Sequence, residues 1–117
     1  MALLYVSANP APPASSAAEA ITALAGGGQV GATLLTGRYN RVTVVATAGD
    51  SVILCPWVRD IRILASNDSA NALAVFPNGT DQIGAGAASA SITVAAGKTA
   101  EFLGSGTQGK WTLIQSA

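Results

Sequence analysis

Few side chains in this chain could carry out acid–base or nucleophilic chemistry. Its 117 residues include no histidine, and Cys55 is the single cysteine. A catalytic thiol needs a neighbouring base or a helix N-terminus that stabilises the thiolate, but Cys55 stands between Leu54 and Pro56 in an apolar stretch. We therefore interpret Cys55 as a buried, unreactive thiol, and nothing in the chain requires an oxidising compartment.

The acidic residues favour structural roles over catalysis or metal binding. Asp50, Asp68 and Asp81 each stand beside Gly, Asn or Thr in a predicted turn, where a carboxylate typically accepts hydrogen bonds from backbone N–H groups. A calcium site needs several acidic residues in one compact loop, and the loops 67–69 and 78–81 offer one each. We predict no catalytic residue, no metal and no cofactor, and hence no enzymatic activity.

The composition indicates a protein whose surface is covered by other proteins. Charged residues make up 10% of the chain, six basic and six acidic residues cancel, and half of the residues are hydrophobic. A typical soluble domain carries about 25% charged residues, and net charge away from zero helps to keep proteins soluble and monomeric. A nucleic-acid partner would need a basic stripe and a membrane helix about 20 apolar residues, so we expect neither partner.

Residues 1–37 differ in composition from the rest of the chain. They are rich in Ala, Pro, Ser and Gly, and such a segment cannot bury enough apolar surface to fold alone. The window 17–25, with Ser16 as N-cap and Glu19 completing a capping box, would allow two helical turns if it were docked. We expect an extended N-terminal arm that orders against a neighbouring subunit, with a flexible linker as the alternative.

Residues 38–117 have the pattern of an all-β domain. Short runs of alternating apolar and polar residues are separated by turn signals about every ten residues, which is typical of a sandwich or a barrel. We expect a compact antiparallel β-sandwich, jelly-roll-like, or a barrel of about seven strands. The expected strands span residues 41–47, 51–55, 59–65, 71–76, 91–94, 99–103 and 110–115.

The alternation also predicts which side chains face the core. The inward set is Val42, Val44, Val52, Leu54, Ile61, Ile63, Leu73, Val75, Ile92, Val94, Phe102, Trp111 and Leu113. The opposite set is unusually apolar and comprises Val45, Ile53, Leu64, Phe76, Leu103 and Ile114. An exposed apolar patch usually marks an interaction surface, although burial of both faces within one monomer is the alternative. The predicted interface with other protein subunits is Leu3, Leu4, Tyr5, Val6, Val45, Ile53, Leu103 and Ile114.

About four-fifths of the chain, from residue 21 to the C-terminus, resembles small structural proteins of tailed bacteriophages. The similar segments are turn and core residues. They are 24–36 (LAGGGQVGATLLT), 41–44 (RVTV), 50–54 (DSVIL), 69–77 (SANALAVFP), 81–84 (DQIG), 95–102 (AAGKTAEF) and 109–111 (GKW).

The resemblance implies a virion protein without catalytic residues. We expect a capsid decoration (cement) protein, made in the host cytoplasm, that binds the assembled head as a homo-oligomer, a trimer. Its partners would be the major capsid protein and further copies of itself. The alternatives are a head- or tail-fibre or spike component, and a carbohydrate-binding module that faces the host and stacks sugars on Trp57, Trp111 or Tyr39.

Overall fold

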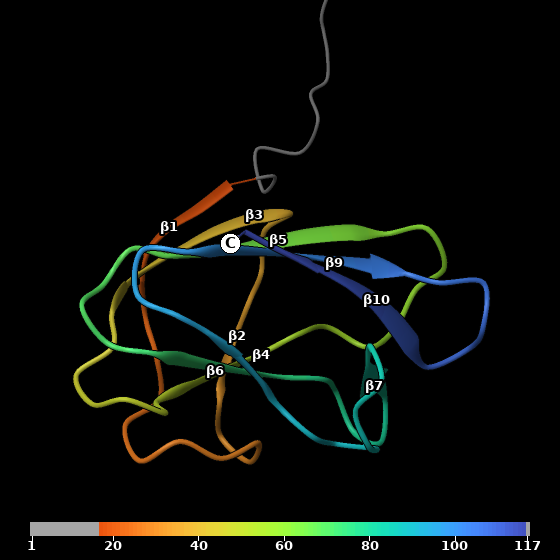
Figure 1. The fold of residues 1–117 in the computed structure, drawn as a ribbon, viewed down its shortest axis with the longest axis horizontal. Helices are drawn as coiled ribbons and strands as arrows, with labels where there is room; N and C mark the ends of the chain where they lie inside the picture. The colour runs from red at the N-terminus through yellow and green to blue at the C-terminus, as the bar shows by residue number, and fades with distance from the viewer. Residues whose placement is uncertain (1–16, 117) are drawn as a thin grey trace, which may run out of the picture.

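The computed structural model describes residues 17–116, which form ten β-strands in two sheets and no helix (Figure 1). The strands are β1 (Ala17–Thr22), β2 (Thr33–Leu34), β3 (Tyr39–Val44), β4 (Ser51–Ile53), β5 (Arg62–Asn67), β6 (Leu73–Phe76), β7 (Gln82–Ile83), β8 (Ile92–Val94), β9 (Thr99–Gly104) and β10 (Lys110–Gln115). The all-β prediction is confirmed. Within residues 17–116, no helix is long and apolar enough to cross a membrane.

The first six strands alternate between two layers. One sheet has the strand order β1-β3-β5-β9-β10-β7, and the other has the order β2-β4-β6-β8. The pairs β1–β3, β3–β5, β2–β4 and β4–β6 are all parallel, so the chain winds three times around a common core. Figure 1 shows the two layers facing each other, with β1, β3 and β5 in one and β2, β4 and β6 in the other.

The C-terminal strands extend both sheets of this parallel winding. β8 pairs antiparallel with β6, and β9 pairs antiparallel with β5. β10 then adds antiparallel to β9, and β7 lies parallel to β10 at the sheet edge. The expectation of an antiparallel sheet is therefore wrong for five of the eight strand pairs, because most consecutive strands cross to the opposite layer instead of forming hairpins.

The number of strands also differs from the expected seven. Each of the seven expected segments overlaps a strand, and β1, β2 and β7 are additional. β2 and β7 have two residues each, too few to produce a recognisable alternation. The short helix over 17–25 is wrong, because 17–22 pairs with β3 and a two-turn helix is marginal without such partners. Residues 17–34 thus supply an edge strand to each sheet, and 1–16 lie outside the described residues.

The core lies between the two layers and contains most of the expected inward residues. Buried as expected are Val42, Val52, Leu54, Ile63, Leu73, Val75, Val94, Phe102 and Trp111, and Ile61, Ile92 and Leu113 are half-buried against them. Trp111 and Phe102 are the largest fully buried side chains. The strand alternation in the sequence therefore located the core.

Val44 and Val45 reverse their expected positions. Val44 is 46% exposed, whereas Val45 is 4% exposed and belongs to the core. The pairing of β1 with β3 shifts between Ile21↔Val42 and Thr22↔Val44, which leaves one extra residue in β3. Because side chains alternate with a period of two, one extra residue moves the following side chains to the other face.

Two fully buried asparagines hold the turns between the layers. Asn40 accepts a hydrogen bond from the Gly37 N–H and donates to the carbonyl oxygens of Gly37 and Leu64. Asn67 donates to the carbonyl oxygens of Asn71 and Val94. Buried polar groups are stable when they are hydrogen-bonded. Asn40 and Asn67 therefore provide hydrogen-bond partners for the backbone of the turns that connect the two layers.

Candidate interaction surfaces

The outer side of the six-stranded sheet carries a row of side chains that crosses four strands. Tyr39 in β3 lies opposite Leu64 in β5, Leu64 lies opposite Glu101 in β9, and Glu101 lies opposite Ile114 in β10. Tyr39 is 37% exposed and Ile114 is 57% exposed. Leu103, two residues beyond Glu101 on the same side of β9, is half-buried.

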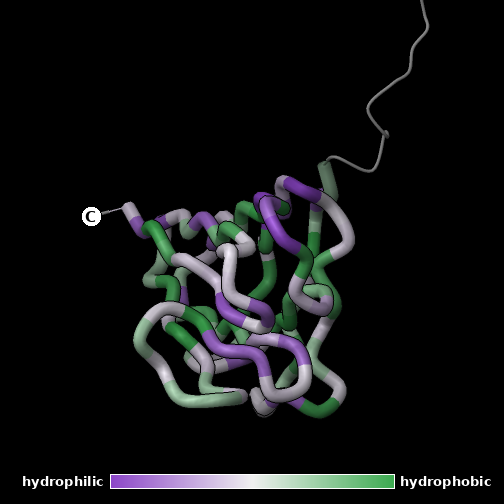
Figure 2. Tube along the Cα trace, turned by 90° about the vertical axis from the view of Figure 1, so that its right-hand side faces the viewer, coloured by the Kyte–Doolittle hydropathy of each residue, from purple (hydrophilic) through white to green (hydrophobic). Residues whose placement is uncertain are grey.

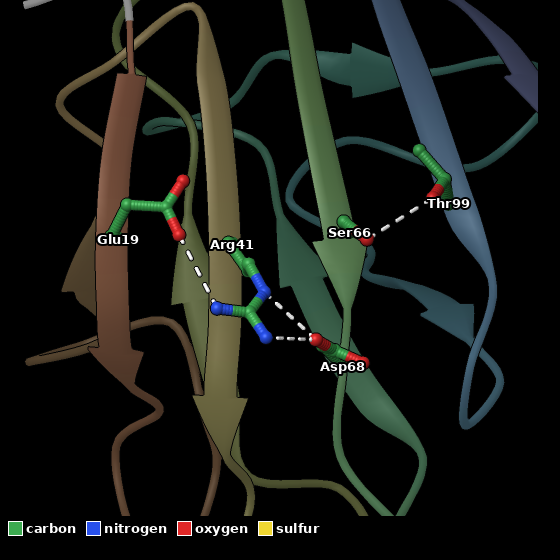
Figure 3. A network of polar contacts seen from close by, with 5 residues as sticks. All are labelled: Glu19, Arg41, Ser66, Asp68 and Thr99. Carbon is green, nitrogen blue, oxygen red and sulfur yellow. Dashed lines mark hydrogen bonds and ion pairs between the residues drawn. The ribbon is translucent and has the colours of Figure 1, made fainter.

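Charged residues on this side are paired with one another. Arg62 in β5 forms a salt bridge with Glu101 in the middle of the row. Arg41 in β3 lies between Glu19 of β1 and Asp68, which follows β5 (Figure 3). Its Nη1 lies 3.4 Å from Glu19 Oε1, and its Nε donates to Asp68 Oδ2 at 2.7 Å.

The pairing of Arg41 has a clear electrostatic effect. The hydrogen bond to Asp68 raises the pKa of the Arg41 guanidinium, and the negative charges of Asp68 and Glu19 raise it further. Beside this network, the Thr99 hydroxyl of β9 donates to the Ser66 hydroxyl of β5 at 3.2 Å (Figure 3). We define the six-stranded face as the apolar residues Tyr39, Leu64, Leu103 and Ile114 together with these paired charges.

The outer side of the four-stranded sheet carries a shorter row that is entirely apolar. Leu34 in β2 lies opposite Ile53 in β4, and Ile53 lies opposite Phe76 in β6. Leu34 is 49% exposed, and Ile53 and Phe76 are half-buried. Near the end of this row, the Gln29 side chain donates to the carbonyl oxygens of Pro77 and Gly79, and its neighbour Val30 is 93% exposed. We call Val30, Leu34, Ile53 and Phe76 the four-stranded face.

The two layers differ sharply in charge. Glu19, Arg41, Arg62, Glu101 and Lys110 all lie in strands of the six-stranded sheet, whereas no strand of the four-stranded sheet contains a charged residue. Its four strands lie within uncharged segments of the chain, 23–37, 51–58, 69–80 and 82–97. Hydrophobic stretches nevertheless run through both layers, as Figure 2 shows.

The predicted interface residues do not form one patch. Leu103 and Ile114 come together on neighbouring strands of the six-stranded face, whereas Ile53 lies in the opposite layer, on the four-stranded face. The prediction of Val45 as an interface residue is wrong, because the shift in the pairing of β3 places its side chain in the core. Leu3, Leu4, Tyr5 and Val6 lie outside the described residues.

Sequence reasoning missed Leu34 and Val30 because the segment 1–37 was expected to be an arm. A signal for Leu34 was present in the chain. The apolar runs that contain Leu34, Ile53 and Phe76 recur every 19 to 23 residues, a spacing that corresponds to one turn of the coil. A period of this length is typical of stacked parallel strands.

The residues considered for chemistry have structural partners. Asp50 is buried and accepts hydrogen bonds from the N–H groups of Gly26 and Thr47, and Asp81 accepts one from the Trp57 N–H. The turn-capping role is thus confirmed for Asp50 and Asp81, whereas Asp68 pairs with Arg41.

Burial raises the pKa of the half-buried Cys55 thiol, which favours its unreactive neutral form.

The described residues define an all-β protein with exposed apolar side chains on both sheet faces. Within residues 17–116, no cavity and no group of three or more potential metal ligands is found. Trp111 is 2% exposed, so it cannot stack a sugar, whereas Tyr39 is accessible on the six-stranded face.

No protein-family model, no curated protein and no solved structure matches the chain.

Proposed function

We propose that the protein is a structural protein of a tailed-bacteriophage virion, a decoration protein that binds the assembled head as a homo-oligomer, a trimer. The observation that carries this proposal is the six-stranded face, where Ile114 and Tyr39 stay exposed in a regular strand row. Exposed apolar side chains beside polar groups are typical of protein interaction surfaces. The resemblance of residues 21–117 to phage structural proteins supports the virion setting.

The paired charges on this face suit it to binding a protein surface. Arg62 is already neutralised by Glu101, and Arg41 by Asp68 and Glu19. A covered ion pair needs less compensation from the partner than an isolated charge, so the major capsid protein can cover this face mainly through apolar contact with Ile114, Leu103 and Tyr39.

Binding of this kind would stabilise the head by mass action. A protein that binds only the assembled shell lowers its free energy by about 4 kcal/mol per site when its free concentration is 1,000 times the dissociation constant. An oligomer that contacts several capsid subunits at once gains further affinity through its raised effective concentration. The decoration role therefore requires a binding surface and no catalytic group.

Co-sedimentation of the full chain with undecorated phage heads tests the proposal. We expect saturable binding by the wild-type protein and at least tenfold weaker binding by Ile114→Glu, since this change adds an unpaired charge to the six-stranded face, directly opposite Glu101. Gln108→Glu adds the same charge in the exposed loop between β9 and β10 and serves as the matched control, with binding unchanged. Glycan binding by the protein without any head binding would instead support a host-facing fibre or carbohydrate-binding role.

A further inference from the structure

We infer that the four-stranded face is the surface through which copies of this chain meet one another at the axis of the homo-oligomer. This inference rests on the self-association that the proposed function includes, and it assigns that contact to the layer opposite the six-stranded face. Its basis is the segregation of charge between the two layers and the exposure of Leu34 and Val30.

Because its strands carry no charge, covering this layer requires little desolvation free energy. None of the strands β2, β4, β6 and β8 contains an ionised side chain. Asp50, which precedes β4, and Asp81, which follows β6, accept hydrogen bonds from backbone N–H groups, Asp50 from Gly26 and Thr47 and Asp81 from Trp57. Burial of an unpaired charge is strongly unfavourable, and the cores of interfaces are depleted of charged residues. The strands of this layer bring no charged side chain into such a contact.

The exposed side chains provide the apolar contact. Leu34, Ile53 and Phe76 form one continuous row across three strands, and Val30 is almost fully exposed near its end. The next residues toward the other end of the strands, Ala74 and Thr93, are small and lie opposite each other. Small side chains beside an apolar row leave room for the side chains of a second sheet to pack against it.

The charge pattern identifies a second copy as the occupant. The four-stranded face offers no counter-charge, so a partner with ionised groups at the contact would leave those groups desolvated and unpaired. The partner surface must itself be uncharged and apolar, and the same face of another copy has these properties. In a cyclic oligomer, the residues nearest the axis meet their own equivalents, which is compatible with the proposed trimer as well as with a dimer.

The accessible surface is large enough for such a contact. The protein exposes 5660 Å², and a standard interface covers about 800 Å² per partner. A contact of standard size would therefore bury about one-seventh of this surface.

Sedimentation velocity of the full chain at micromolar concentration tests the inference. We expect the wild-type protein to sediment as an oligomer and Leu34→Glu and Val30→Glu to raise the dissociation constant at least 100-fold, toward the 11.6 kDa monomer. Both side chains are exposed, so the variants should keep the wild-type circular dichroism spectrum. Ile114→Glu changes a residue of the opposite layer whose exposure (57%) is close to that of Leu34 (49%); it is the matched control and should remain oligomeric.

A cross-linking experiment gives a second readout that does not depend on destabilising the contact. In a Cys55→Ser background, Leu34→Cys should form an intermolecular disulfide under mild oxidation, and Ile114→Cys should not. An oligomer that survives Leu34→Glu and Val30→Glu, or that dissociates with Ile114→Glu, would overturn the inference and leave self-association itself intact. A monomeric wild-type chain would overturn both this inference and the proposed homo-oligomer. Binding to the head is measured separately, by co-sedimentation.

Discussion

Gly104, the last residue of β9, packs so closely against the loop before β5 that a methyl group cannot be added. A Cβ at this position would lie 1.8 Å from the Val58 carbonyl oxygen and 2.9 Å from its carbonyl carbon. Two backbone hydrogen bonds of 2.8 Å join the same elements, from Asp60 N–H to the Gly104 carbonyl and from Gly104 N–H to the Ile61 carbonyl. In Gly104→Ala the loop must therefore move away from β9.

The size of the effect follows from these contacts. Each lost backbone hydrogen bond contributes about 1 kcal/mol, and the strain of an overfilled site typically costs about 1–3 kcal/mol. We expect Gly104→Ala to lower the free energy of unfolding by about 3–5 kcal/mol. This is a large share of the stability of a domain of this size, which is about 5–15 kcal/mol.

Urea unfolding followed by tryptophan fluorescence measures this loss. Gly106→Ala is the matched control, because its Cβ would meet only the end of the Arg59 side chain, at 3.5 Å, and its φ is not in the left-handed region. The control should change stability by less than about 0.5 kcal/mol. An unfolding midpoint of Gly104→Ala equal to that of the wild-type protein would show that the loop and β9 do not pack as described.

Three further changes have expected outcomes that the same urea assay measures. Phe102→Ala should lower the free energy of unfolding by about 3–5 kcal/mol, because it leaves a cavity between the layers. Asp50→Ala should lower it by about 2 kcal/mol, because the N–H groups of Gly26 and Thr47 lose their acceptor. Burial raises the pKa of Cys55, so the unfolded chain ionises first and stability should fall as the pH rises above the ordinary thiol value; Cys55→Ala should remove this fall.

Each of these changes has an outcome that would contradict its reasoning. Phe102→Leu should cost less than Phe102→Ala, and equal losses would argue against a cavity. Asp50→Asn keeps one acceptor oxygen and should lie between the wild-type protein and Asp50→Ala. For Cys55, the same alkaline loss of stability in Cys55→Ala would assign that loss to another group.

The alternation of side chains predicted much of the core but not the pairing of the strands. Val42 and Ile63 were recognised as inward because each stands in a short run with a period of two. The same runs are compatible with hairpins and with crossovers to a second layer, because a strand buries one face in either arrangement. The parallel coil of β1 to β6 is thus a property of long-range pairing, which local pattern does not encode.

The candidate surfaces show the same division. The low content of charge and the apolar outward residues Leu103, Ile114 and Ile53 were visible in the chain, and they predicted an interaction protein. Their separation onto two opposite faces was not visible, because it depends on which strands share a sheet. Val45 shows how sensitive such assignments are, since one extra residue in β3 moved it from the surface to the core.

Composition and periodicity by themselves determined that this chain forms β-strands, where most of its core residues lie and that it offers few groups for catalysis. These properties follow from local chemistry, since each residue contributes its own polarity and backbone preference. Only the tertiary structure decided that residues 17–34 belong to the sheets, that the charged strands gather in one layer and that Leu34, Ile53 and Phe76 line up in the other. Those outcomes depend on contacts between residues about 20 positions apart, which become favourable only when the whole coil closes around one core.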